Sequence, residues 1–344
     1  MKIFTDDGYL NMKSIIDTKL SFIIIVGARA VGKTYGALSY ALETGRKFIY
    51  MRNTQEQANL ISKNEFSPFK SITRDTGIEI ITKPISKYNA AFYKAKENEQ
   101  GELLASGPAI GYTMALSTVS NIRGFDASDV ELLFWDEFIP EVHEKKIKNM
   151  GDGFLNAYET INRNRELKNC PPLQAVLMAN ANDLANPVFM SLRIINKVEH
   201  MMRKGQVYSL DYSRGIGIFL IGNSEISKRK QNTALYRLTS GSDYGAMALA
   251  NEFAEIRHGS INPQPIKEYI PIATIGEITF YKHKNNKTYY CSTMKVGTPK
   301  EYEPNDTGIK RFARDHSYIY RAYMRNNIYF EDTTAEVIYK TYIG

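Results

Sequence analysis

The sequence predicts an α/β domain with a mainly parallel sheet flanked by helices, followed by a smaller, β-rich α+β domain. Three observations predict it. An apolar run at 22–26 leads through a glycine-bounded loop into a helical stretch. A second apolar run at 47–52 follows that helix, and strand, helix and strand in this order form a βαβ unit with parallel strands. After about residue 230 short β-type runs dominate the pattern, which indicates a second domain.

Composition limits the class of protein. The chain has 344 residues, with 43% apolar and 24% charged residues, as is ordinary for a globular protein. Its net charge of +7 suggests an anionic partner such as nucleic acid, although many basic proteins bind no polymer. Cys170 and Cys291 form no metal-ligand spacing and no disulfide framework, which fits a reducing cytoplasm. No apolar stretch is long enough to cross a bilayer and no signal-peptide pattern is present, so we expect a cytoplasmic protein without a membrane segment.

Residues 27–34 read Gly-Ala-Arg-Ala-Val-Gly-Lys-Thr, the complete P-loop pattern between a strand and a helix. The two glycines let the backbone fold tightly enough for its N–H groups to surround phosphate oxygens. Lys33 can reach the β- and γ-phosphates, the Thr34 hydroxyl can ligate Mg²⁺, and the helix start adds its positive dipole. The sequence therefore predicts that a nucleoside triphosphate binds with Mg²⁺. The nucleotide-binding residues are expected to be Gly27, Ala28, Arg29, Ala30, Val31, Gly32, Lys33 and Thr34.

The elements after the loop continue the α/β pattern. A helical stretch at 33–44 ends at Gly45, a natural C-cap, and the second strand and a helix at 54–64 follow. Residues 77–106 differ, because short β-type runs alternate with Asn, Gly and Glu turns. They predict a β-hairpin or meander inserted into the domain, and a strand near 111–116 comes next.

Residues 131–138, Glu-Leu-Leu-Phe-Trp-Asp-Glu-Phe, predict a buried strand with two acids at its carboxyl end. Open α/β sheets bind their ligands at that end. Asp136 is expected to hold Mg²⁺ opposite the P-loop hydroxyl, and Glu137 to orient and polarise the attacking water. An acid pair at a strand end is common by itself. Downstream of a complete P-loop, it indicates hydrolysis.

The next two elements carry further candidates. A predicted helix at 153–165 ends in Arg163 and Arg165, which either are solvated charges at a helix end or supply an arginine finger to the transferring phosphoryl group. A predicted strand at 173–180 ends in Asn180. Its amide either contacts the γ-phosphate or the attacking water, or caps the turn that follows. The residues alone leave both questions open.

We expect an ATPase domain at 1–200, a connecting region at 201–230 with irregular residues from 211, and a second domain at 231–344. The elements expected along this part are a helix at 186–199, a strand at 207–210, helical residues at 231–255, a hairpin at 278–292, a helical basic stretch at 309–326 and a last strand near 337–342. Basic residues interleaved with tyrosines in the second domain would suit nucleic acid, but they equally suit a solvated surface.

With these motifs located, the chain resembles the DNA-packaging ATPases of phi29-type bacteriophages, which are ring motors of the ASCE class related to terminase large subunits. Order and spacing match over about residues 20–255, whereas the rest of the chain matches only in length and β-rich character. The segments that carry the resemblance are 26–34, 48–52, 134–138, 162–166, 178–181 and 241–245.

The resemblance implies roles for particular residues. Arg29 looks like the extra P-loop arginine of viral packaging ATPases. Arg163 corresponds to the family's arginine finger, which acts in trans on the nucleotide of the neighbouring subunit. Arg123 falls where the family has a second basic trans-acting residue, and Arg165 is a further candidate. Asn180 falls at the family's coupling position after the strand that follows the acid pair.

The resemblance also implies a pentameric ring, docked at the portal vertex of a viral procapsid in the cytoplasm of a bacterial host. Its substrate would be double-stranded DNA, and some members of the family use a structural RNA. The C-terminal domain is expected to resemble a vestigial RNase H-type nuclease. We expect no nuclease activity, because residues 230–344 show no carboxylate triad for two-metal cleavage. The acids in unlike contexts there are Asp243, Glu277, Asp315 and Asp332.

Three functions compete at this point. The first is an ATP-driven translocase for double-stranded DNA that hydrolyses ATP at subunit interfaces of a ring. The second is a nucleotide or small-molecule kinase, but a kinase needs an acceptor pocket and usually a lid, whereas the acid pair favours water as acceptor. The third is a non-catalytic ring-assembly protein that uses NTP only to assemble, and such a protein would not need Glu137. The sequence favours the translocase.

Overall fold

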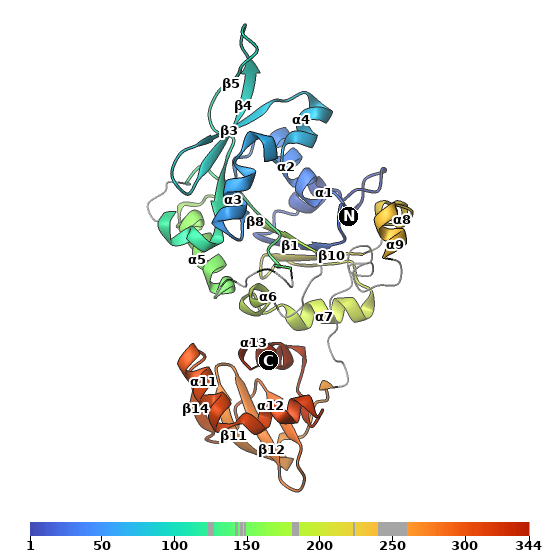
Figure 1. Cartoon of the computed structure of the whole chain (residues 1–344), viewed down its shortest axis with the longest axis vertical. Coiled ribbons are helices and arrows are strands. Elements are labelled where there is room, and N and C mark those ends of the chain that lie inside the picture. The colour runs from blue at the N-terminus through green and yellow to red at the C-terminus, as the bar shows by residue number, and fades with distance from the viewer. Residues whose placement is uncertain are drawn as a thin grey trace. The chain divides into compact units, whose positions relative to one another are not determined.

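A computed structural model describes residues 1–122, 127–141, 144, 147, 149–180, 186–222, 224–239 and 260–343 of the chain. The chain forms two compact units, Met1–Asn182 with Lys204–Ala254 and Asp183–Arg203 with Glu255–Gly344 (Figure 1). Each unit has its own sheet and its own apolar core. Within the described ranges, no helix is both long and apolar enough to cross a membrane.

A ten-stranded sheet forms the first unit. Its order is β3-β4-β6-β2-β7-β8-β1-β10-β9, and β5 pairs with β4. The six strands from β6 to β10 run parallel, whereas β9 at one edge and β4 and β3 at the other pair antiparallel. The strands are β1 (Phe22–Gly27), β2 (Phe48–Arg52), β3 (Ile80–Pro84), β4 (Ala90–Glu97), β5 (Leu103–Ala105), β6 (Gly111–Ala115), β7 (Leu132–Asp136), β8 (Gln174–Ala179), β9 (Tyr208–Asp211) and β10 (Ile216–Ile221).

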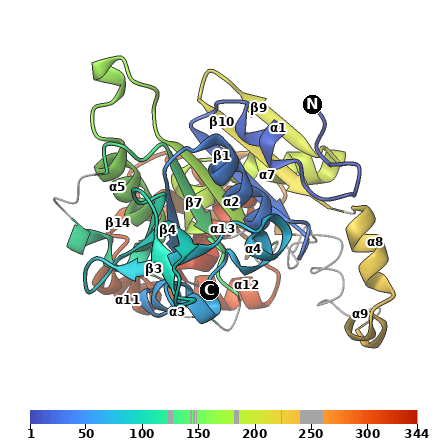
Figure 2. The same ribbon diagram turned by 90° about the horizontal axis from the view of Figure 1, so that it is seen from above.

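Helices cover both faces of this sheet. Alternate residues of a strand point to opposite faces, so Ile23 of β1 joins the core under α2 while Phe22 packs against Phe154 of α5. Figure 2 shows α2 lying between α1 and α4. The helices of this unit are α1 (Met12–Ile16), α2 (Lys33–Thr44), α3 (Gln55–Ile61), α4 (Lys70–Thr76), α5 (Met150–Asn162), α8 (Glu225–Gln231) and α9 (Ala234–Leu238), with 3₁₀ turns at Asn64–Phe66, Leu116–Ile122 and Glu166–Lys168.

The central strands are buried along most of their length. All side chains of 23–26, 132–135 and 175–179 are at most 1% exposed. Continuous apolar runs of this kind are typical of parallel strands that are covered on both faces. The predicted α/β class with a mainly parallel sheet is confirmed.

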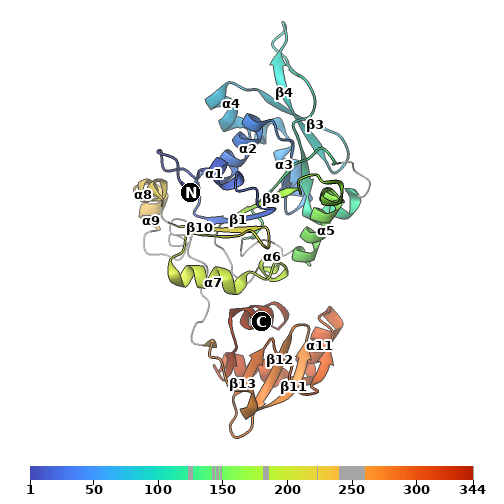
Figure 3. The same cartoon turned by 180° about the vertical axis from the view of Figure 1, so that it is seen from behind.

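The predicted hairpin at 77–106 is also present. β3, β4 and β5 pair antiparallel in turn, and β4 continues beyond the rest of the sheet (Figures 1 and 3). β4 pairs with β6 as well, through Ala91 and Phe92. The hairpin is therefore the edge of the main sheet.

The expectation of irregular structure from residue 211 is wrong for Ile216–Ile221. This segment is β10, which pairs in parallel with β1 from Phe22 onward. Glycines on either side and inside the run hid a continuous apolar strand. Gly215 needs its positive φ of +66° to turn the chain beside Ser21, and β10 starts directly after it.

The second unit contains a five-stranded sheet in the order β14-β11-β12-β13-β15. β12 and β13 form the hairpin that the sequence predicted. The strands are β11 (Tyr269–Ile275), β12 (Ile278–His283), β13 (Tyr289–Ser292), β14 (Lys300–Tyr302) and β15 (Ile328–Phe330), and the helices are α6 (Pro187–Ser191), α7 (Ile195–Lys204), α11 (Asp306–Asp315), α12 (Ser317–Met324) and α13 (Thr333–Tyr342), with a 3₁₀ turn at Ile266–Glu268.

Two predictions for this unit need correction. The expected strand near 337–342 is part of helix α13, because Asp332 caps the helix by accepting a hydrogen bond from Ala335 N at 2.8 Å. The compact units also depart from the predicted limits at 200 and 231, since Asp183–Arg203 clusters with the C-terminal residues. Of the predicted helical residues 231–255, α9 is described, and the part from residue 240 lies outside the described residues.

Candidate active site

Three neighbouring parallel strands of the first unit bring their carboxyl ends together. β8 lies between β7 and β1 in the sheet. The register pairs Val26 with Ala179 and Asp136 with Met178. The P-loop, the acid pair and Asn180 therefore leave the sheet at the same edge, as their positions at strand ends in the sequence predicted.

The backbone of the P-loop is shaped for an anion. Gly32 precedes α2 with a φ of +88°, and Ala30 also has a positive φ of +61°. A loop that alternates in this way turns successive N–H groups toward one point, in front of the positive end of the helix. Gly27 leaves little room, because a Cβ there would lie 3.1 Å from the side chain of Ile221.

Lys33 is held inside the loop by three oxygen acceptors. Its Nζ donates to the carbonyl oxygens of Gly27 at 2.8 Å and Ala28 at 2.9 Å, and to Oδ1 of Asn180 at 3.1 Å. Burial lowers the pKa of Lys33 to about 8, against the opposing effect of nearby carboxylates. Asn180 thus lies beside the phosphate-binding lysine, while its chemical role stays a prediction.

Thr34 and Asp136 face each other across the site. Thr34 Oγ1 donates to Asp136 Oδ2 at 2.8 Å, and the hydroxyl of Tyr50 donates to the same oxygen at 2.6 Å. Burial and the adjacent Asp136 raise the pKa of Tyr50 well above its ordinary value, so the phenol stays a donor. Mg²⁺ is usually held by one or two carboxylates together with substrate phosphates, and this hydroxyl–carboxylate pair fits that ion.

Glu137 forms an ion pair with an arginine from a neighbouring strand. Its carboxylate forms an ion pair with the guanidinium of Arg52, which also lies 3.5 Å from Asp136. The backbone of Glu137 has a φ of +56°, and its carbonyl oxygen accepts from Asn53 Nδ2 at 2.7 Å. The Glu137 side chain is half exposed, in contrast to the buried Asp136 beside it.

The sequence analysis missed Arg52 and Tyr50 as site residues. Both lie on β2, which pairs with β7 so that Met51 stands opposite Trp135. Arg52 therefore reaches the level of Asp136 at the carboxyl end of the neighbouring strand. The sequence does show a basic residue at the end of the strand that follows the P-loop helix. The local sequence does not show that β2 pairs with β7, and this pairing brings Arg52 to the site.

The arginine of the P-loop also forms an ion pair. Arg29 forms an ion pair with Glu141, five residues beyond the strand that carries the acid pair. Both side chains are about one-third exposed. Arg123, a predicted trans-acting residue, lies outside the described residues.

Arg163 and Arg165 lie at the other end of the sheet. Asn162, the last residue of α5, accepts a hydrogen bond from Leu173 N at 2.7 Å, directly before β8 begins. Arg165 donates to the carbonyl oxygens of Ser128 at 2.9 Å and Val130, in the turn that leads into β7. The structure therefore does not bring these arginines to the P-loop of their own chain.

A cavity of about 890 Å³ surrounds the P-loop face of the first unit. It is lined by the loop, by the acid pair and by residues of the N-terminal segment between Thr5 and Lys13. The size lies within the range of small-molecule sites, and the lining includes Lys33, Asp136 and Glu137. The arrangement can bind a triphosphate with its metal and expose a terminal phosphate to a carboxylate base.

Comparisons of the sequence with known proteins point to one family. A family model described as podovirus DNA encapsidation protein (Gp16) matches residues 6–262. A DNA packaging protein of Bacillus phage PZA is 26% identical over 247 residues, which are 70% of this chain and 64% of that protein. The DNA packaging protein of Bacillus phage phi29 is 26% identical over 242 residues, covering 69% and 63%. The match thus spans somewhat less than two thirds of these relatives.

Two solved structures share the fold over almost the whole chain. The Phi-28 gp11 DNA packaging motor gives a TM-score of 0.65 at 18% identity, covering 97% of each chain. The bacteriophage Phi-29 viral genome packaging motor assembly gives a TM-score of 0.63 at 18% identity, covering 99% of this chain and 98% of that one.

Proposed function

We propose, because the chain belongs to the podovirus DNA encapsidation protein (Gp16) family, that it is an ATP-driven translocase that packages double-stranded viral DNA into a procapsid. Its relatives in two Bacillus phages are named DNA packaging proteins. The observation that carries the ATPase part is the 2.8 Å contact of Thr34 with the buried Asp136, beside Lys33. This joins the P-loop to the acid strand in one site.

In the proposed reaction each side chain has a separate task. Lys33 exchanges its carbonyl partners for the β- and γ-phosphates. Thr34 and Asp136 would hold Mg²⁺, and this ion would supply positive charge next to the phosphates. Glu137 leaves its ion pair with Arg52, orients a water molecule toward the γ-phosphorus and accepts a proton from it. Asn180, hydrogen-bonded to Lys33, is suited to contact the γ-phosphate or that water. ADP and phosphate are the products.

A second subunit would complete the site. The end of α5 lies at the start of β8, whereas the P-loop lies at the carboxyl end of the same sheet. The residues of β8 together span roughly 20 Å at about 3.3 Å per residue. Arg163 is thus too far from its own P-loop to act there, which supports the predicted action in trans on the nucleotide of a neighbour. Arg123 remains a second trans-acting candidate. Arg165 is a weaker one, since its guanidinium already binds backbone oxygens of its own chain.

A site shared between identical subunits implies a head-to-tail ring, because each subunit then gives an arginine and receives one. We propose a pentameric ring at the portal vertex of the procapsid, in the cytoplasm of the bacterial host. Double-stranded DNA is the proposed substrate, and a structural RNA is a proposed additional partner. The net charge of +7 favours polyanionic partners of this kind.

We further propose that the second unit has no nuclease activity and is a vestigial nuclease of the RNase H type. Two-metal cleavage needs several carboxylates gathered around the metals. In the described part of the chain, no three His, Cys, Asp or Glu side chains form a metal-binding group. Mn²⁺-dependent cutting of plasmid DNA by the purified protein is the result that overturns this proposal.

The experiment that tests the proposed function is phosphate release measured with and without double-stranded DNA at several protein concentrations. The account predicts stimulation by DNA and a rate per subunit that rises steeply with concentration, because the site is completed between subunits. Phosphate transfer to a small-molecule acceptor would favour a kinase instead. Hydrolysis by Glu137→Gln at the parent rate would favour a ring-assembly protein that does not need the base.

A further inference from the structure

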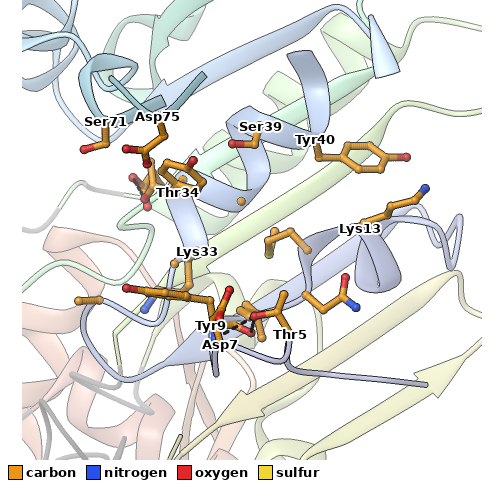
Figure 4. Close-up of a pocket in the computed structure, with 18 of the residues that line it drawn as sticks. Thr5, Asp7, Tyr9, Lys13, Lys33, Thr34, Ser39, Tyr40, Ser71 and Asp75 are labelled. Atoms are coloured by element: carbon orange, nitrogen blue, oxygen red, sulfur yellow. Dashed lines mark hydrogen bonds between the residues drawn. The ribbon is translucent and has the colours of Figure 1, made fainter. Parts of the chain in front are cut away.

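The P-loop explains how a triphosphate binds, but part of the cavity wall comes from an N-terminal segment that this function does not use. In this segment, residues 5–13, all but Asp6 and Gly8 line the cavity together with the loop. Figure 4 shows Thr5, Asp7 and Tyr9 on the same side of the cavity as Lys33. Tyr9 is the large aromatic side chain of this segment, and it is 47% exposed.

The segment is fastened to the P-loop itself. Leu10 N donates to the carbonyl oxygen of Val31 inside the loop at 2.9 Å. Further along, α1 packs so closely on α2 that a Cβ on Gly36 would lie 2.6 Å from Met12. The position of the segment is therefore fixed relative to the phosphate-binding atoms.

The backbone of Tyr9 is hydrogen-bonded within this segment. Its carbonyl oxygen accepts from Thr5 N at 2.8 Å, and its own N–H donates to Thr5 Oγ1 at 3.2 Å. The tight turn between them needs Gly8 at a φ of +85°, packed against Glu225. The ring lies over Gly32, since a Cβ there would be 3.3 Å from a ring carbon of Tyr9.

We infer that Tyr9 stacks on the base of the bound nucleotide, so that residues 5–10 form the base-binding wall of the site. This inference rests on the proposed function, because it requires that the P-loop binds a nucleoside triphosphate. An aromatic ring that lies over the phosphate loop and lines the cavity is the feature that a flat base requires. Every base has a π-face, so the ring contributes affinity without selecting one base.

The test compares two ligands on the full-length protein, Mg–ATP and Mg–tripolyphosphate, by equilibrium binding. Tripolyphosphate has the phosphates but no base, so the ratio of the two affinities isolates the contribution of the base. Stacking on an aromatic ring is worth about tenfold in affinity. Tyr9→Ala should therefore lower the affinity for ATP about tenfold and leave that for tripolyphosphate unchanged.

Two further variants make the result specific. Tyr9→Phe keeps the ring and should retain the parent ratio, whereas Tyr212→Ala removes a tyrosine that is 68% exposed at the β9–β10 turn and should change nothing. Equal affinity of Tyr9→Ala and parent for ATP overturns the inference. So does an equal loss for both ligands, which would assign the ring to support of the P-loop. If the parent protein binds neither ligand, the proposed function fails instead.

Discussion

At the scale of single residues, burial lowers the pKa of the Lys33 side chain. With a pKa of about 8, it is charged below that pH and increasingly neutral above it before nucleotide binds. Phosphates favour the charged form, so binding at pH 8 should take up roughly half a proton per site, and much less at pH 6.5. Calorimetry of Mg–ATP binding in buffers of different ionisation enthalpy measures this uptake.

The matched control is Lys33→Arg, because a guanidinium stays charged throughout this range. Its binding should show no uptake from position 33 at either pH. If the parent and this variant exchange the same number of protons at pH 8, then Lys33 is already charged there before nucleotide arrives.

Arg163 and Arg165 are close in sequence but differ in their contacts. Mutating them should therefore affect different properties, hydrolysis for Arg163 and stability for Arg165. Arg165→Ala removes hydrogen bonds from a charged group to carbonyl oxygens of the turn before β7, worth about 1.5–3 kcal/mol, and should lower the melting temperature. Arg163→Ala changes an exposed side chain, so its melting temperature should hold while hydrolysis falls on the order of 10³-fold or more. Nucleotide binding should survive in both variants.

Much of the site could be predicted at this scale because its chemistry is local in sequence. The P-loop is one contiguous segment, and Asp136 and Asn180 each follow an apolar run that marks a strand end. Arg52 and Tyr50 could not be predicted in the same way. They reach Asp136 only because β2 and β7 are neighbours in the sheet, and strand order is set by long-range packing.

At the scale of elements, the pairing of β2 with β6 depends on one glycine. A Cβ on Gly111 would lie 2.6–2.8 Å from three ring atoms of Phe48, which is fully buried. Gly111→Ala must shift that ring and should destabilise the first unit by about 1–3 kcal/mol, measured by chemical denaturation.

Gly153 in α5 provides the opposite case. A Cβ there would meet Leu116 at 3.7 Å, an ordinary contact, and alanine favours a helix over glycine by about 0.5–1 kcal/mol. Gly153→Ala should therefore stabilise the same unit. A loss of stability in Gly153→Ala as large as that in Gly111→Ala would show that backbone freedom, not the Phe48 contact, decides both results.

Element type was predictable where the apolar pattern was long, and it failed where local preference and packing disagree. Residues 337–342 are rich in β-branched and aromatic residues, which favour strands. Ala335, Ile338 and Tyr339 nevertheless follow the helical spacing and enter the core of the second unit together. Asp332 caps the start of the helix. This capping residue lies outside residues 337–342, so the composition of that segment alone does not reveal the helix.

At the scale of the whole molecule, the chain crosses between its two units more than once. Glu199 of α7 is 6% exposed and accepts a hydrogen bond from Thr333, at the start of α13, while Asn196 donates to Asp332 at 2.9 Å. Glu199→Ala removes a buried carboxylate partner. Hydrogen exchange should therefore become faster at the first turn of α13 and remain unchanged in β1 and β8.

Lys197→Ala, an exposed neighbour on α7, is the control and should leave the exchange of α13 unchanged. Faster exchange spread evenly over both sheets in Glu199→Ala would contradict the assignment of α7 to the second unit. The sequence could not predict this crossing, because the segment 186–203 looks like a continuation of the ATPase domain.

The central claim concerns the assembly: Glu137 and Arg163 of one chain serve two different sites. Mixing inactive Arg163→Ala and Glu137→Gln subunits tests this directly by DNA-stimulated phosphate release. In a head-to-tail ring assembled at random from equal amounts, roughly one interface in four combines an intact Glu137 with an intact Arg163 from its neighbour. The account predicts that the mixture regains up to about this fraction of the parent rate, although neither variant hydrolyses ATP alone. No recovery at any mixing ratio would contradict it.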